Sequence, residues 1–289
     1  MERQTVASAT LCKSYAAPSV SMPVSMPVPM GFTFYLGVHH PGWLTQTTVP
    51  LFVSEKRLET RKTLPRAAGM WALDSGGFSQ LMMHAGWPDD SEARYVAHVQ
   101  RYRNEIGNLE WAAPQDWMCE PFMVAKTGLS IAEHQRRTVE NYLTLRELDE
   151  TLPFIPVLQG YTRDDYLRCI DRYAAYGVPL TDRPRLGVGT VCRRQGMREA
   201  EEIVRSIHRA LPSARLHVFG VKITGLVRFA DAVASADSMA WSYHARRNPP
   251  LPGHRHKSCA NCLEFALNWY QHVRRMSAVV QPPLLEIVA

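Results

Sequence analysis

The stretch Trp71-Ala72-Leu73-Asp74-Ser75-Gly76-Gly77-Phe78 decides the fold of this chain. A short apolar run followed by a carboxylate, a hydroxyl and two glycines predicts a buried strand with a polar C-terminal end. The glycines allow the backbone to turn sharply and to approach a ligand closely. An ordinary strand followed by a polar turn has the same pattern, so this stretch alone does not identify a site. Its weight comes from the recurrence of the pattern along the chain.

Eight apolar runs in the sequence predict strands of this kind. They are Phe32–Val38, Val49–Ser54, Met70–Ser75, Leu109–Asp116, Phe154–Gly160, Leu186–Val191, Leu216–Lys222 and Ser238–Ser242. Strands that alternate with helices indicate βα units and a parallel sheet. Eight such units in about 250 residues match the size of a (β/α)₈ TIM-type barrel. We prefer this α/β barrel to a doubly wound open sheet, because no glycine-rich phosphate-binding sequence follows the first strand.

Amphipathic segments between the later runs predict the helices. Ser130, with Glu133 three residues on, forms a capping box that opens a helix running to about residue 150. Thr162 opens a second helix, which ends at Gly177. Three further helices are expected, over Met197–Leu211, Leu226–Ala236 and Cys259–Arg275.

Composition describes a globular protein with a basic balance. The chain has 289 residues, 46% hydrophobic and 21% charged, which excludes a disordered or fibrous protein. Its net charge of +6 comes almost entirely from arginine and suits a polyanionic partner. Residues 1–31 are rich in Ser, Ala, Pro and Met and predict a poorly ordered arm before one domain at 32–289.

Neither a signal peptide nor a membrane span is expected. Residues 1–4 lack the apolar core of a signal peptide, and the proline-broken segment 20–30 is too short to cross a bilayer. We therefore expect no membrane partner and a cytoplasmic location, which is the host cytoplasm if a phage encodes the protein. Six scattered or paired cysteines in such a protein argue against a disulfide framework.

The C-terminal ends of the predicted strands carry most of the polar residues. In a TIM-type barrel these ends form one mouth, where the active site lies. In chain order the ends supply His39-His40, Asp74-Ser75, Asp116, Gln159-Gly160, Gly187–Thr190 and Lys222, and finally Asp237 leads into Ser238–Ser242. A single Asp at such a place is usually a helix cap or a loop residue. Three carboxylates at one mouth instead indicate a catalytic site.

Five sequence blocks resemble those of the tRNA-guanine transglycosylase (queuine tRNA-ribosyltransferase) superfamily. They are Leu73–Phe78, Gln115–Pro121, Val157–Gly160, Leu186–Gly189 and Phe219–Lys222, in the superfamily's order. The longer segments at 112–121, 191–195 and 235–242 are more similar to the phage and bacterial branch that places 7-deazaguanine bases in DNA. The resemblance therefore implies a DNA-guanine transglycosylase, a glycosyltransferase that exchanges guanine for a base such as preQ0.

The resemblance also implies roles for the mouth residues. Asp237 would be the nucleophile that forms a covalent glycosyl–enzyme intermediate, and Asp74 would be the general acid/base. The target guanine would be flipped out of duplex DNA or presented on a single strand. The residues expected to bind the base are Ser75, Phe78, Asp116, Gln159, Gly187, Gly189 and Phe219, and those expected to contact phosphates are Arg193, Arg194, Arg246 and Arg247.

A Cys/His cluster predicts a small C-terminal zinc element at residues 254–275. Thiolates and imidazoles at short spacing suit tetrahedral Zn²⁺. We expect His256, Cys259 and Cys262 as three ligands and His272 as the fourth, with His254 as its rival. Lys257 stands where the superfamily has its first cysteine. A site with four protein ligands is closed, so this zinc would be structural.

Two other functions remain open at this stage. The same chemistry on tRNA is the first, since no single residue distinguishes deoxyribose from ribose. A zinc-containing barrel that binds nucleic acid without turnover is the second, and it requires Asp74 or Asp237 to be sequestered. Superfamily members are often dimers, so a homodimer is also an expectation.

Overall fold

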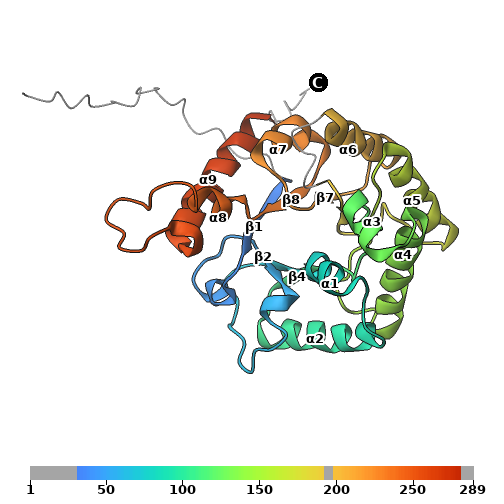
Figure 1. Ribbon diagram of the computed structural model, residues 1–289, viewed down its shortest axis with the longest axis horizontal. Helices are drawn as coiled ribbons and strands as arrows, with labels where there is room; N and C mark the ends of the chain where they lie inside the picture. Colours follow the sequence, from blue (N-terminus) through green and yellow to red (C-terminus); the bar gives the residue numbers. More distant parts are fainter. Residues whose placement is uncertain (1–30, 192–197, 281–289) are drawn as a thin grey trace, which may run out of the picture.

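The computed structural model describes residues 31–191 and 198–280, and within them eight parallel strands form one curled sheet (Figure 1). The strands are β1 (Thr33–Val38), β2 (Leu51–Ser54), β3 (Trp71–Asp74), β4 (Leu109–Ala112), β5 (Val157–Leu158), β6 (Leu186–Val188), β7 (Leu216–Val218) and β8 (Ser235–Ser238). Their order is β4-β3-β2-β1-β8-β7-β6-β5. The sheet therefore runs through the chain's strands in cyclic order, with β1 paired to β8.

The two edges of the sheet, β4 and β5, come together through a short contact. Ala112 forms a parallel bridge with Phe154, just before β5, and its amide and carbonyl bond to Pro153 and Ile155. The predicted parallel α/β fold of TIM-like form is thereby confirmed.

Helices surround the sheet, except that Gly77–His84 lies over its open centre (Figure 1). They are α1 (Gly77–His84), α2 (Ser91–Glu105), α3 (Pro121–Thr127), α4 (Ile131–Leu148), α5 (Arg163–Ala175), α6 (Arg198–Ala210), α7 (Ile223–Phe229), α8 (Ala240–Ala245) and α9 (Leu263–Val280). Only the short 3-10 turns η1 (Pro41–Thr45) and η2 (Glu55–Arg57) lie within the connections after β1 and β2. The first two units thus depart from a regular (β/α)₈ pattern. In the described ranges, no helix is long and apolar enough to cross a membrane.

The predicted caps of two helices are confirmed. The Ser130 hydroxyl accepts a hydrogen bond from the Glu133 amide at the start of α4. Thr162 and Asp165 form a reciprocal capping box at the start of α5. Gly177 follows α5 with a positive φ of 69°, which glycine adopts without strain.

The prediction was wrong about the end of the barrel. The eighth strand is Ser235–Ser238, and α8 occupies most of the segment expected to be a strand. The helix expected over 226–236 is α7 followed by the 3-10 turn η3 (Ala230–Ala232), and the last helix starts at Leu263, after the turn η4 (Cys259–Asn261). Strand β8 has only small and polar side chains, and its Asp237 and Ser235 lie in register beside the larger Tyr35 and His217 of the neighbouring strands.

The curled sheet has separate cores on its two faces. The larger one fills the space between strands and outer helices. The smaller one lies inside the curl, where Tyr35, Ala72 and Trp111 from three strands meet although their strand neighbours face outward. Phe52 and Phe219 pack on top of this inner cluster, toward the carboxyl ends of their strands. The inner core is therefore the floor of any site at the mouth.

Candidate active site

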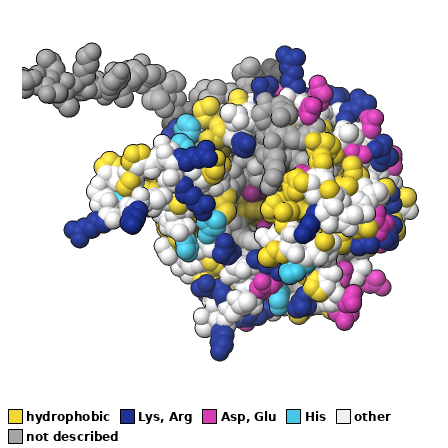
Figure 2. All heavy atoms as spheres, viewed as in Figure 1, with side chains coloured by type: hydrophobic (Ala, Val, Ile, Leu, Met, Phe, Trp, Pro, Cys, Tyr) yellow, Lys and Arg dark blue, Asp and Glu magenta, His cyan; other side chains and the backbone are white. Residues whose placement is uncertain are grey.

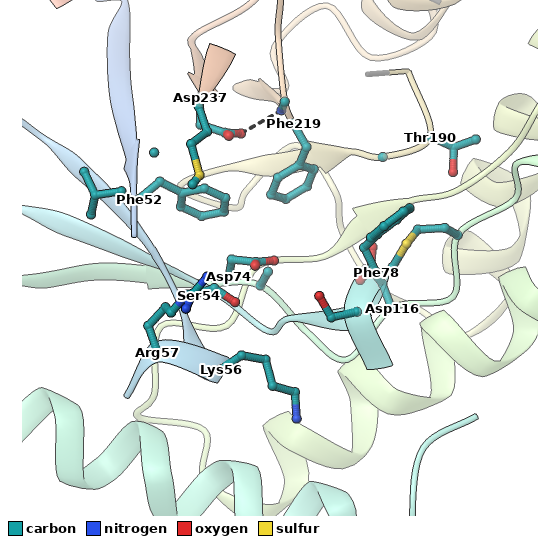
Figure 3. Close-up of a pocket in the computed structure, with 18 of the residues that line it drawn as sticks. Phe52, Ser54, Lys56, Arg57, Asp74, Phe78, Asp116, Thr190, Phe219 and Asp237 are labelled. Carbon is teal, nitrogen blue, oxygen red and sulfur yellow. Dashed lines mark hydrogen bonds between the residues drawn. The ribbon is translucent and has the colours of Figure 1, made fainter. Parts of the chain in front are cut away.

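A cavity of about 670 Å³ opens at the carboxyl ends of the strands. Figure 2 shows it as a hollow at the centre of the molecule, with an acidic side chain visible inside. Asp74, Asp116 and Asp237 all line it, together with Gln159 and Phe219 (Figure 3). Side chains that are far apart in the sequence therefore share one space, as the strand ends predicted.

Strand β8 holds Asp237 almost fully buried, with 6% of the residue exposed. The Gly220 amide donates to Oδ1 at 3.0 Å (Figure 3), and His217 Nε2 lies 3.3 Å from the same oxygen. On the other side of its ring, His217 Nδ1 lies 2.9 Å from the Ser235 hydroxyl. Burial lowers the pKa of His217, which favours the neutral ring, and the tautomer that fits both contacts has Ser235 donating to Nδ1 and Nε2 donating to Asp237. Two donors thus orient one oxygen of a carboxylate at the cavity wall.

Asp74 ends β3 and faces the same cavity from another strand (Figure 3). Burial raises the pKa of Asp74 to about 6, although hydrogen bonds from the Ser54 hydroxyl and the Gly76 amide act in the opposite direction. The negative charge of Asp237 adds to the increase. Gly76 places its amide there at a φ of 76°, in the left-handed region that favours glycine. A carboxyl with such a pKa can give and take a proton near neutral pH.

Asp116 is the end of a chain of hydrogen bonds that begins at a backbone amide. The Cys119 amide donates to the Thr190 hydroxyl at 2.9 Å, and that hydroxyl donates to Gln159 Oε1 at 2.6 Å. Gln159 Nε2 then donates to Asp116 Oδ2. Burial raises the pKa of Asp116 to about 7, while the bond from Gln159 acts against that rise. The order of donors settles the orientation of the Gln159 amide.

Two glycines of β6 and its end make room for these side chains. A Cβ on Gly189 would lie only 2.3 Å from Gln159 Nε2, so this position requires glycine for a close approach. Gly187 lies beneath Phe219, whose ring a Cβ would meet at 2.7 Å. Of the two predicted base-binding glycines, Gly189 lines the cavity, whereas Gly187 is absent from its wall and instead supports Phe219.

The remaining predicted base-binding residues lie in two different places. Phe78 on α1 is 41% exposed, lines the cavity and packs edge-on against Phe122 with ring centroids 6.3 Å apart. Figure 3 shows Phe78 and Phe219 on different sides of the cavity. The Ser75 hydroxyl is buried, does not line the cavity and has no hydrogen-bond partner among the described residues. Its contact with the base stays a prediction.

Of the four predicted phosphate-binding arginines, only two belong to the described residues. Arg193 and Arg194 lie outside those ranges. Arg246 lines a groove beside the cavity, and the exposed Arg247 stacks over the Tyr243 ring at 4.0 Å. These two neighbouring residues thus have different surroundings.

Four side chains just before α9 form a compact cluster that can hold a metal ion. The ligand atoms of His254, His256, Cys259 and Cys262 all lie within 4.8 Å of one another. His256 Nε2 is 3.0 Å from Cys259 Sγ, and His254 Nδ1 is 3.7 Å from Cys262 Sγ. The other nitrogen of His254, Nε2, lies 3.1 Å from Glu264.

The structure corrects the predicted fourth ligand. His272 is exposed and does not belong to the cluster, where His254 takes the fourth place. Because α9 begins at Leu263, a residue at His272 lies about 14 Å further along the helix axis. The prediction chose His272 because it is near Cys262 in the sequence, but each helical residue moves the chain about 1.5 Å further from the cluster.

Sequence reasoning missed several residues that shape the site, among them Phe52, Ser54 and His217. Ser54 ends β2 and pairs in register with Asp74, and Phe52 lies two residues before it. A strand period of two, counted back from this polar end, would have placed both at the mouth. His217 carried no signal, because a polar residue inside an apolar run has many structural explanations.

Comparisons with known proteins identify the family. Among solved structures, the crystal structure of the homocysteine methyltransferase MmuM from Escherichia coli, oxidized form, is similar with 12% identity and a TM-score of 0.36. The similarity covers 76% of this chain and 90% of that one. The search of curated proteins returned no match. The family model of DpdA, DeoxyPurine in DNA protein A, matches residues 30–287. The chain therefore belongs to the DpdA family, a family of DNA-guanine transglycosylases within the tRNA-guanine transglycosylase superfamily.

Proposed function

We propose that this protein replaces guanine in DNA with a 7-deazaguanine base through a covalent glycosyl intermediate on Asp237. One observation carries the proposal. Asp237 and Asp74, from opposite parts of the sequence, line one cavity, and each has defined hydrogen-bond donors. Paired carboxylates with different surroundings suit a double displacement at a sugar carbon.

In the first displacement, Asp237 attacks C1′ of the nucleotide while the bond from C1′ to the guanine nitrogen breaks. The electron pair of that bond leaves with guanine, and Asp74 supplies the proton that neutralises it. In the second displacement, Asp74 takes a proton from the incoming base, whose nitrogen attacks C1′ and releases Asp237. Two inversions preserve the configuration of the sugar.

The role of Asp74 requires a carboxyl that holds a proton before the reaction. Burial raises its pKa to about 6, so a substantial fraction is protonated just below neutral pH. Asp237 has the complementary requirement, because a nucleophile must be ionised. The Gly220 amide and His217 both contact its Oδ1 and hold the carboxyl group in place at the cavity wall.

Asp116 and Gln159 are the groups that we assign to recognition of the purine edge. Gln159 has both ends of its amide engaged, by Thr190 and by Asp116, so its orientation is set before a base arrives. The Asp116 carboxylate can accept from the N1–H and the exocyclic amine of a guanine-like base. A 7-deazaguanine has the same groups on that edge, which allows one pocket to serve both displacements.

We further propose that His254, His256, Cys259 and Cys262 hold a structural zinc ion. Zinc bonds of about 2.0 to 2.3 Å in a tetrahedron require ligand atoms about 3.3 to 3.8 Å apart. Three of the pairs lie at 3.0, 3.3 and 3.7 Å, close to that range. Glu264 would orient His254 from the second nitrogen, as carboxylates do for metal-bound histidines. When bound, the ion would hold together the segment from His254 to Cys262, just before α9.

The experiment that tests the proposed reaction follows labelled guanine into and out of DNA, with tRNA in parallel. Exchange with DNA alone, together with a denaturation-stable protein–DNA adduct, supports the proposal. Asp237→Ala should remove both, whereas Asp171→Asn, which changes an exposed carboxylate on α5, should keep both. Exchange with tRNA alone, or exchange by Asp237→Ala, would contradict it. Mass spectrometry of nucleosides from DNA co-expressed with the protein then identifies the inserted base.

A further inference from the structure

A second groove, of about 530 Å³, adjoins the cavity and is lined by basic side chains. It lies over the connections that follow β1 and β2, on the side of α8. Figure 2 shows Lys, Arg and His side chains gathered on one side of the central hollow. The basic residues that line the groove are His39, His40, Lys56, Arg57, Arg61 and Arg246. None of its lining residues is acidic.

Three of these arginines have no carboxylate to neutralise them. Lys56 pairs with Glu59 at 3.3 Å, but Arg57, Arg61 and Arg246 form no ion pair with any residue of the described ranges. Several arginines on the outer helices do pair, as Arg136 does with Glu133 and Glu140. Positive charge left unpaired in a concave surface favours an anionic ligand.

The groove brings together parts of the chain that are far apart in the sequence. Arg246 follows α8, whereas Arg57 ends η2, yet both act on the same side chain, His39. Burial lowers the pKa of His39, and the positive charges of the two arginines add to this effect. His39 is also placed from α8, since its Nε2 lies 3.4 Å from the Ser242 hydroxyl. The fold thus concentrates positive charge at one place.

The groove is continuous with the catalytic cavity, because His39, Lys56 and Arg57 line both. A nucleotide whose base and sugar enter the cavity must leave its phosphates outside. The strand then continues along whichever neighbouring surface accepts negative charge. Among the described residues beside the cavity, those of this groove provide a positively charged surface that can accept the phosphates.

We propose that this groove binds the backbone phosphates next to the target guanine, on the strand that carries it. Arg57, Arg61 and Arg246 contact those phosphates, and planar guanidinium groups suit their oxygens. The inference rests on the proposed function, because it takes the ligand to be the strand whose base enters the cavity. It goes beyond that function by naming the residues that hold the strand.

The test measures binding of a single-stranded DNA oligonucleotide with one guanine over a range of salt concentrations. Arg57→Gln, Arg61→Gln and Arg246→Gln each remove one charge from an exposed side chain. Each should weaken binding and lower the slope of log affinity against log salt by about 0.7, the value for one contact to a single strand. Arg215→Gln is the matched control, since Arg215 is exposed at the opposite, N-terminal end of β7.

A second oligonucleotide localises the contact. Its phosphates on both sides of the guanine are replaced by uncharged methylphosphonates. The wild-type protein should bind it more weakly than the natural strand, while Arg246→Gln should lose little further affinity, because the two changes remove the same contact. Fully additive losses would overturn the assignment, as would variants that bind with wild-type affinity and salt slope. Equal loss in the Arg215→Gln control would also overturn it.

The outcome can be separated from the proposed reaction. If the wild-type protein exchanges guanine but the groove variants bind normally, the groove assignment fails and the reaction stands. If the groove variants lose binding while the wild-type protein modifies no DNA, the proposed reaction fails and the groove assignment stands. A protein that binds an RNA strand through the groove, and not the DNA strand, refutes the inference for DNA.

Discussion

Replacing Asp74 with Asn should stabilise the folded protein at neutral and higher pH. The side chain keeps its size: its amide oxygen can accept from the Gly76 amide, and its NH2 group can donate to the Ser54 hydroxyl, which can also act as an acceptor. What it loses is a negative charge in a desolvated place. Burial raises the pKa of Asp74 from 3.8 to about 6, so ionising it in the folded state is unfavourable.

The magnitude follows from that change of pKa. It corresponds to about 3 kcal/mol, and water in the cavity screens part of it, so about 1 to 3 kcal/mol is expected. Because the folded pKa is raised, the folded state holds a proton that the unfolded state loses first. The stability of the wild-type protein therefore decreases as pH rises from about 4 to about 6 and stays lower above that range.

Thermal unfolding of the wild type and Asp74→Asn at several pH values measures this effect. The variant should unfold roughly 2 to 10 °C higher near pH 8 and at nearly the same temperature near pH 4. Asp171→Asn, on the exposed face of α5, should show no such dependence. The reasoning is refuted if Asp74→Asn unfolds at a lower temperature near pH 8, or if its advantage is equal at both pH values. Gain of stability with loss of exchange is the pattern expected of a catalytic residue.

Three further outcomes are expected. Gly189→Ala should reduce exchange about tenfold or more with a smaller change in melting temperature, since the added Cβ displaces the Gln159 amide, and exchange rates at saturating DNA check this. His254→Ala should lose bound metal and melting temperature whereas His272→Ala keeps both, and mass spectrometry of the intact protein under native conditions measures the metal. His217→Phe should lower kcat about tenfold while KM for DNA stays unchanged, because it removes a donor to the nucleophile but keeps the packed ring; an increase in KM alone would contradict this role.

Much of the fold follows from local patterns in the sequence. Seven of the eight strands lie within the apolar runs that predicted them, and two helices begin at the predicted caps. These features depend on residues a few positions apart, so a linear pattern contains the necessary information. The eighth strand, Ser235–Ser238, was not predicted at its correct position because its small and polar residues form no apolar run. They lie beside larger side chains of the neighbouring strands.

The sequence by itself determined that Asp74 and Asp116 end apolar runs and therefore share one mouth. Asp237 was assigned to that mouth through the family resemblance, because the predicted eighth strand began only at Ser238. Only the tertiary structure decided that His217 orients Asp237 and that His254 replaces His272 in the metal cluster. It also left Ser75 out of the cavity wall. The physical reason is that strand ends are placed by the topology alone, whereas contacts between distant side chains depend on register, strand curl and helix rise, which act only once the chain is folded.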